Sequence, residues 1–141
     1  RNFVPLASLG AARKSLDETI EYVKQRQAFG QSLSKWQAVA NELATEATKI
    51  EAARLLTYEA ARAYDRGERC DMEAGMAKLF ASEAAVSNSM DGMRIFGGYS
   101  YSTDYDIERY FRDSPLMCIG EGTNEMQRII IARQLAARNP A

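Results

Sequence analysis

Histidine is absent from the 141-residue sequence, and cysteine and proline are scarce, with two and three residues. The absence of histidine excludes Ser-His-Asp and Cys-His catalysis and removes the usual ligands of most transition-metal sites, so no metal site is predicted. Cys70 and Cys118 lie far apart without a Cys-x-x-Cys pair, which indicates free thiols rather than a disulfide framework or a zinc site. Free thiols suit a reducing compartment, for which we expect the bacterial cytoplasm, with the mitochondrial matrix as the alternative.

Long apolar runs and an excess of one charge are also missing. No uninterrupted apolar run reaches the roughly 18 residues of a membrane span. With 18 Lys and Arg against 19 Asp and Glu, the net charge of -1 gives no basic surface for nucleic acid or an acidic membrane. A hydrophobic content of 46% is typical of a globular protein, and the length favours one domain. Because residue 1 is Arg rather than Met, we expect a piece of a longer polypeptide.

Residues that favour helices dominate the sequence, and apolar side chains recur every three or four positions. This spacing predicts helices and no convincing strand. The helices are expected over about residues 3–28, 37–64, 71–96, 106–112 and from 124 onward. The predicted fold class is therefore all-α. We expect one domain over residues 1–141, an antiparallel up-down four-helix bundle with one short extra helix.

Capping patterns predict where these helices begin and end. Ser34 and Gln37 fit a capping box for the second helix, and Asp71 is the expected cap of the third. Pro115 is expected to close the short helix. The last helix is expected to turn four apolar side chains inward, those of Met126, Ile129, Ile130 and Leu135.

Two segments depart from simple bundle patterning. Arg26 could complement the dipole of a helix C-terminus, with Phe29 as a packing residue, or the Arg26 guanidinium could bind a phosphate in a bidentate fork. Gly97 and Gly98 could simply end a helix, or they could let a ligand approach free backbone N–H groups. Taken singly, each segment favours the purely structural interpretation.

A third segment, residues 119–125, has Glu121 between two glycines just before a helix. The carboxylate could complement the dipole of that helix, whose expected N-cap is Thr123 or Asn124. Alternatively, Glu121 could act as a general base on a mobile turn with apolar neighbours. Local features do not decide between these two interpretations.

In this order and spacing, the three segments resemble the C-terminal domain of the acyl-CoA dehydrogenase family, and residues 112–113 and 129–133 extend the resemblance over essentially the whole chain. The resemblance implies a flavoenzyme whose N-terminal helical domain and middle β-domain are absent from this chain. The family oxidises the Cα–Cβ bond of an acyl-CoA thioester to a trans-2-enoyl-CoA, and its FAD passes electrons to electron-transfer flavoprotein. A homotetramer, arranged as a dimer of dimers, is also implied.

The resemblance assigns roles to residues near the third segment. By position, Glu121 resembles the catalytic base that removes the α-proton while a hydride leaves Cβ for flavin N5. In this family the backbone N–H of the same Glu and a flavin ribityl hydroxyl polarise the thioester oxygen. Besides Glu121, the implied substrate contacts are Arg1, Gly120 and Gly122.

A cofactor site shared between subunits is implied as well. Arg26 and Phe29 match positions that contact the FAD pyrophosphate and adenine from a neighbouring subunit. Trp36 and Gln37 are expected near this subunit boundary, although a core position is an equally good expectation for Trp36. The further implied contacts to FAD are Arg94, Gly97, Gly98, Thr123 and Glu125.

The sequence also departs from the family pattern, and two alternative functions stay open. Arg94 and Glu125 stand where many members have Gln, and Gly120 stands where straight-chain enzymes often have an aromatic residue, which favours a branched or bulky acyl group. An acyl-CoA oxidase or another flavin oxidase could use the same scaffold, as could a non-catalytic helical-bundle subunit. Because the β-domain is missing, the chain alone is expected to be inactive.

Overall fold

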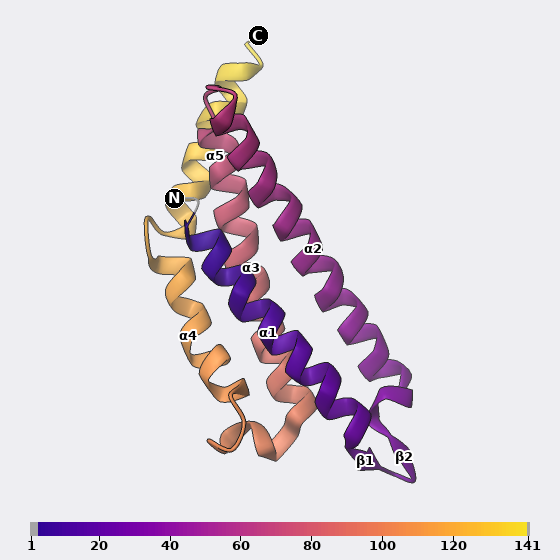
Figure 1. Ribbon diagram of the computed structural model, residues 1–141. Helices are drawn as coiled ribbons and strands as arrows, with labels where there is room; N and C mark the ends of the chain where they lie inside the picture. Colours follow the sequence, from indigo (N-terminus) through magenta and orange to yellow (C-terminus); the bar gives the residue numbers. More distant parts are fainter. Residues whose placement is uncertain (1–2, 141) are drawn as a thin grey trace.

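The computed structural model describes residues 3–140 of the chain (Figure 1). Within this range the chain forms five α-helices, one two-stranded hairpin and two short 3-10 helices. The α-helices are α1 (Phe3–Gln25), α2 (Gln37–Asp65), α3 (Asp71–Phe96), α4 (Ile107–Ile119) and α5 (Asn124–Arg138). The all-α fold class is therefore confirmed. None of the described helices is long and apolar enough to cross a membrane.

The direction of the helices explains how five of them make a four-helix bundle. α1, α2 and α3 alternate in direction, whereas α4 and α5 follow each other in the same direction along α3 (Figure 1). α3 packs against all four other helices, and α1 also contacts α2 and α4. Two shorter helices in succession therefore fill the fourth position of the bundle. The break between them is the turn that carries Glu121.

Small residues of α3 form the centre of the core. Its buried alanines are Ala74, Ala77, Ala81, Ala84 and Ala85. Because these side chains are small, neighbouring helices approach α3 closely, and a Cβ added to Gly92 would lie 3.1 Å from the hydroxyl of Ser15 on α1. Two larger apolar side chains of α3, those of Phe80 and Met90, are 38% and 37% exposed, whereas Phe96 at its end is buried.

A hairpin that the sequence patterning did not predict follows α1, which ends at Gln25 rather than at residue 28. Strand β1 (Gln27–Ala28) pairs antiparallel with strand β2 (Gln31–Ser32). The turn residues Phe29 and Gly30 have φ angles of 52° and 82°. Positive φ at both turn positions matches the twist of a hairpin. Two-residue strands are too short to show the alternation that predicts a strand.

The expected capping box at the start of α2 is wrong. The side chain of Ser32, not Ser34, accepts a backbone hydrogen bond, from the N–H of Ser34 at 3.3 Å, and so begins the 3-10 helix Leu33–Lys35. The Ser34 hydroxyl lies 2.8 Å from that of Ser32 and is engaged there. α2 then begins after Trp36 without a side-chain cap.

Two other expected helix ends differ from the structure. α3 begins at Asp71 itself, whose carboxylate pairs with Arg69 at 3.0 Å instead of capping the helix. Pro115 does not close α4, which continues to Ile119. A proline inside a helix removes one backbone hydrogen bond. The packing of α4 against α1 and α3 outweighs this loss.

α5 packs Gln127 and Ile131 against Gly75 of α3, so the expected set of inward apolar side chains is wrong. Asn124 and Gln127 are buried, because the surface of α3 that they meet carries Lys78 and Ser82, which bond to Asn124. Of the four side chains expected to point inward, only Ile130 is half-buried. The exposed fractions of the other three are 48% for Met126, 42% for Ile129 and 44% for Leu135.

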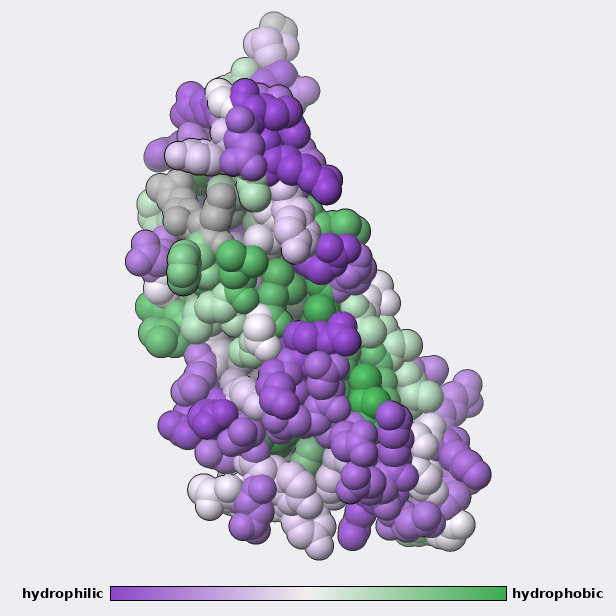
Figure 2. All heavy atoms as spheres, viewed as in Figure 1, coloured by the Kyte–Doolittle hydropathy of each residue, from purple (hydrophilic) through white to green (hydrophobic). Residues whose placement is uncertain are grey.

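Hydrophobic side chains also form a band across the face seen in Figure 2, where the first turns of α1 lie beside the end of α4. The exposed apolar residues of these two segments are Phe3, Leu6, Leu116 and Ile119. A contiguous apolar surface of this kind is typical of a face that another domain or chain covers.

Candidate functional site

The turn between α4 and α5 carries the predicted base. Gly120 ends α4, and its N–H donates to the carbonyl of Leu116 at 2.8 Å. Glu121 and Gly122 follow with φ angles of 56° and 94°. A left-handed backbone costs a non-glycine residue about 1–2 kcal/mol, and such conformations are concentrated at functional sites. The Glu121 side chain that this backbone carries is exposed.

The first turn of α5 holds the other side of this segment. Thr123 is the N-cap, as one of the two predictions had it, and its Oγ1 accepts a hydrogen bond from the N–H of Met126 at 3.4 Å. Hydrogen bonds from its own backbone N–H and from the Thr123 hydroxyl hold the pKa of the exposed Glu125 carboxyl below its usual value. Gln127 Nε2 donates to the carbonyl of Gly122 at 3.1 Å. The Glu121 turn is therefore tied to a helix on each side.

A buried polar cluster beneath the turn is the part of the site that the sequence analysis missed. Lys78 of α3 is completely buried, and its Nζ donates to the carbonyl of Cys118 at 3.0 Å and to Oδ1 of Asn124 at 2.7 Å. The hydroxyl of Ser82 lies 3.1 Å from the same Oδ1. The available signal was the position of Lys78, which follows directly after Ala77 on the buried face, where charged residues are rare.

A second group of predicted residues lines a cavity of about 560 Å³ where the hairpin meets the end of α3. Arg26, Gly97 and Gly98 all line it, so the structure brings three of the predicted cofactor residues together. Gly97 has a φ angle of 62° and begins a 3-10 helix, Gly97–Tyr101. A Cβ on Gly97 or Gly98 would meet no atom within 4 Å, so the backbone is open to a ligand.

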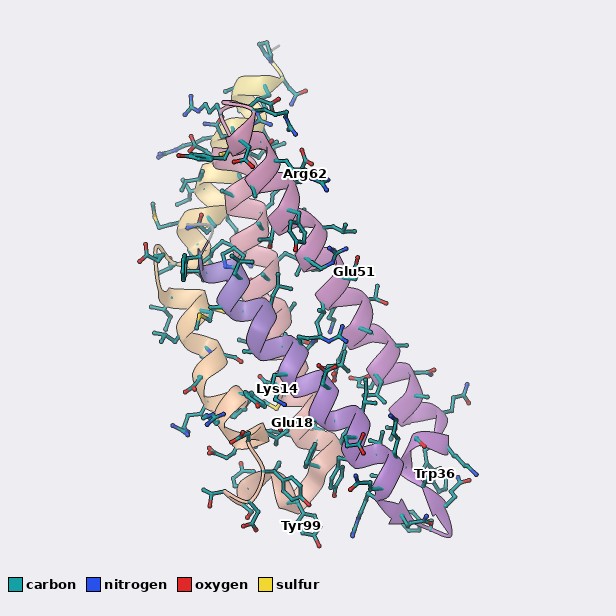
Figure 3. The ribbon with its side chains drawn as sticks, in the orientation of Figure 1. Lys14, Glu18, Trp36, Glu51, Arg62 and Tyr99 are labelled. Atoms are coloured by element: carbon teal, nitrogen blue, oxygen red, sulfur yellow. The ribbon has the colours of Figure 1, made fainter. Side chains whose placement is uncertain are left out.

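The guanidinium of Arg26 suits an anion in this cavity. It lies 5.3 Å from the centre of the Tyr99 ring, which Figure 3 shows at the lower end of the molecule. None of the ion pairs that form among residues 3–140 includes Arg26. A guanidinium without a carboxylate partner, beside open backbone, presents a fork of N–H donors that matches a phosphate.

Phe29 and Trp36 form an exposed aromatic pair at the hairpin, near which Figure 3 labels Trp36. Their rings meet edge to face with centroids 6.0 Å apart. Phe29 is 94% exposed and Trp36 is 37% exposed, so the expectation of a core position for Trp36 is wrong. Gln37 is the next residue and begins α2 beside this pair.

The predicted residues that the structure describes thus form two separate groups, and one of them, Arg94, lies in neither. Figure 1 shows the hairpin at the lower end of the bundle and the turn between α4 and α5 in its upper half. Arg94 does not line the cavity, and its guanidinium pairs instead with Asp91 at 3.0 Å. Arg1 lies outside the described residues. Within residues 3–140, no group of three or more Cys, Asp or Glu residues is arranged to hold a metal ion.

The model of the acyl-CoA dehydrogenase C-terminal domain matches residues 1–136. The chain belongs to the acyl-CoA dehydrogenase family. An acyl-CoA dehydrogenase of Bacillus subtilis is 47% identical over 128 residues, which cover 91% of this chain and 34% of that protein. The caffeyl-CoA reductase-Etf complex subunit CarC of Acetobacterium woodii is 41% identical, over the same shares of the two chains. The chain therefore spans about a third of the length of these curated relatives.

Solved structures contain the same helical domain. Butyryl-CoA dehydrogenase from Megasphaera elsdenii is 39% identical, with a TM-score of 0.94 over 96% of this chain and 35% of that one. The FAD complex of PigA is 32% identical, with a TM-score of 0.89 over 94% of this chain and 34% of that one. The fold expected of an acyl-CoA dehydrogenase C-terminal domain is thus confirmed.

Proposed function

We propose that this chain supplies the catalytic base and part of the FAD site of an acyl-CoA dehydrogenase, which converts an acyl-CoA thioester to a trans-2-enoyl-CoA. The observation that carries the proposal is the exposed Glu121 carboxylate, held at a φ angle of 56° between Gly120 and Gly122. A base needs to be accessible to its substrate and fixed in direction, and this turn provides both. The names of the Bacillus and Megasphaera relatives support the reaction type.

In the proposed reaction, Glu121 takes the α-proton of the thioester while the hydrogen on Cβ leaves as a hydride. When bound, FAD supplies the hydride acceptor at N5. The backbone N–H of Glu121 donates to the thioester oxygen and stabilises the negative charge that develops there. Gly120 carries no side chain, which leaves room beside the reacting carbons, and a branched or bulky acyl group fits such a space.

The cavity at the hairpin is suited to the anionic part of FAD. Arg26 would hold the pyrophosphate, and the open backbone at Gly97 and Gly98 would let the adenosine part approach. Phe29 would add an aromatic contact from the hairpin tip, where it is 94% exposed. PigA, which has the same helical domain, was solved as an FAD complex, and this supports the cofactor.

The separation of the two groups supports a cofactor shared between copies. Arg26 and Glu121 lie toward different parts of the bundle (Figure 1). We therefore assign the hairpin of one copy to the FAD that would serve Glu121 of another copy, in a dimer of dimers. The exposed Phe29–Trp36 pair supports a hairpin that contacts something beyond its own bundle.

Electron-transfer flavoprotein is the proposed electron acceptor, which the name of the Acetobacterium CarC subunit supports. The same name describes a reductase, so the reverse reaction, reduction of an enoyl-CoA, is the second candidate. An oxidase would instead consume oxygen without a protein acceptor. Oxygen uptake during acyl-CoA turnover separates the oxidase from the other two. Turnover in each direction with the flavoprotein present separates a dehydrogenase from a reductase.

The deciding experiment is an anaerobic titration of the full-length FAD-loaded protein with straight and branched acyl-CoAs. Loss of the oxidised-flavin absorbance with one of them supports dehydrogenation and identifies the substrate class. We expect a branched acyl-CoA to reduce the flavin more completely than its straight isomer. Bound flavin that no acyl-CoA reduces would contradict the proposal.

A further inference from the structure

The charge on the buried lysine beneath the Glu121 turn is poorly explained by stability alone. Lys78 is completely buried, and none of the ion pairs that form among residues 3–140 includes it. The carboxylates of Glu83 and Glu125 both pair with Arg128 instead. Burial lowers the pKa of Lys78. A buried charge without a carboxylate partner is costly, and an apolar residue of similar volume would serve the core better.

The two acceptors of this lysine belong to the two helices on either side of the catalytic turn. Cys118 is the last residue but one of α4, and Asn124 is the first residue of α5. The ammonium reaches the Cys118 carbonyl at 3.0 Å, at the negative end of the α4 dipole, and Oδ1 of Asn124 at 2.7 Å. Ser82 adds a second bond to Asn124, again from α3. A single buried cation therefore links α3 to both ends of the segment that contains Glu121.

We propose that Lys78 is a positioning residue for Glu121: by holding Cys118 and Asn124 together, it fixes the direction of the Glu121 carboxylate and backbone N–H. This inference rests on the proposed function, in which Glu121 is the base. A base acts only within hydrogen-bond reach of the proton that it removes. A misplacement of about 1 Å, from a change that does not touch the substrate, lowers a rate roughly 100-fold.

The test uses the full-length FAD-loaded protein and compares two lysine variants. Lys78→Met keeps the apolar stem and removes the ammonium. Lys49→Met is the matched control, because Lys49 is a half-buried lysine whose Nζ donates to Ser87 at 2.8 Å, but it lies on α2 away from the turn. We expect Lys78→Met to reduce its flavin about 10- to 100-fold more slowly with acyl-CoA, with FAD content and KM little changed. Lys49→Met is expected to match the unaltered protein.

Variants of Asn124 provide a second, independent test of the proposal. Asn124→Asp keeps an acceptor for Lys78, so we expect it to retain most of the rate of flavin reduction. Asn124→Ala removes that acceptor and should lower the rate as much as Lys78→Met does. Because both residues act through one contact, the double variant of Lys78→Met and Asn124→Ala should be no slower than the slower single variant. Losses that multiply in the double variant would overturn the inference.

Two further results would also overturn it. One is a rate of flavin reduction in Lys78→Met within about twofold of that of the unaltered protein. The other is a fall in that rate that is fully explained by a lower content of bound FAD. If no acyl-CoA reduces the unaltered protein, the proposed function fails, and hydrogen exchange of residues 119–124 then tests the lysine by itself. Faster exchange in Lys78→Met than in Lys49→Met supports the link between the helix ends, and equal exchange overturns it.

Discussion

The side-chain amide of Gln127 donates a hydrogen bond from Nε2 to the carbonyl of Gly122 at 3.1 Å. A Cβ added to Gly122 would lie 3.0 Å from that same nitrogen. Gly122 also has a φ angle of 94°, where a side chain is strained. A glycine is therefore required after Glu121 for two reasons: the backbone has a positive φ angle, and Gln127 occupies the space that a side chain would need.

The first prediction follows from this contact. Gly122→Ala should lower the rate of flavin reduction about 10- to 100-fold, because the turn must shift away from Gln127 and carries Glu121 with it. Gly67→Ala is the matched control, since Gly67 has a φ angle of 72° but open space around it. Both variants should lose about 1–2 kcal/mol of stability from backbone strain. Stopped-flow reduction by acyl-CoA checks the prediction, and equal rates for the two variants would contradict it.

The second prediction concerns Glu46, which is completely buried between α2 and α3 and has no hydrogen-bond partner for either carboxyl oxygen among the described residues. Burial, together with the charges of Asp91 and Glu42, raises the pKa of Glu46 to about 8 against the opposing charge of Lys49. The folded state thus keeps its proton to a higher pH than the unfolded chain. The contribution of Glu46 to stability is therefore full below about pH 4.5 and is lost as the pH rises toward 8.

Glu46→Gln should remove this pH dependence. In the unaltered protein the loss due to Glu46 is on the order of 1 kcal/mol for each pH unit between the two pKa values. Glu59→Gln is the control, because Glu59 is exposed and pairs with Arg66 at the surface. The measurement is the denaturation midpoint from pH 5 to pH 9. A slope that persists in Glu46→Gln would show that another group is responsible.

The third prediction concerns Phe29 at the hairpin tip. Phe29→Gly should relieve about 1 kcal/mol of backbone strain, because φ is 52° there, and should leave the bundle folded. It should also weaken FAD binding about tenfold, equivalent to the loss of one aromatic contact. Equilibrium dialysis of FAD checks this, with Tyr64→Ala as a control at another exposed aromatic residue. Unchanged FAD affinity in Phe29→Gly would contradict a cofactor role for the hairpin.

The long helices could be predicted because apolar periodicity persists through the 23, 29 and 26 residues of α1, α2 and α3. The short elements could not. The two strands contain two residues each, and their pairing depends on the positive φ angles of Phe29 and Gly30 rather than on alternation. Pro115 misled the prediction for α4, because the packing that sustains the helix past it comes from α1 and α3.

The site was predictable where its residues are local in sequence. Glu121 stands between glycines before a helix, and Gly97 and Gly98 end a long one, so each could be recognised in place. The residues that support Glu121 could not be found in this way. Lys78 bonds to Cys118, 40 positions later, and nothing in the sequence near Lys78 identifies Cys118 as its partner. The same bonds explain why α5 buries Asn124 and leaves Met126 exposed.

The most direct test of the account is the rate at which acyl-CoA reduces the flavin in Glu121→Gln, measured anaerobically in the full-length FAD-loaded protein. Glu51→Gln, an exposed acid on α2, is the control. The account predicts that Glu121→Gln still binds FAD and acyl-CoA but reduces roughly 10²- to 10⁴-fold more slowly, the usual contribution of a general base, while the control is unaffected. Reduction of Glu121→Gln at the unaltered rate would contradict it and would mean that another residue removes the α-proton.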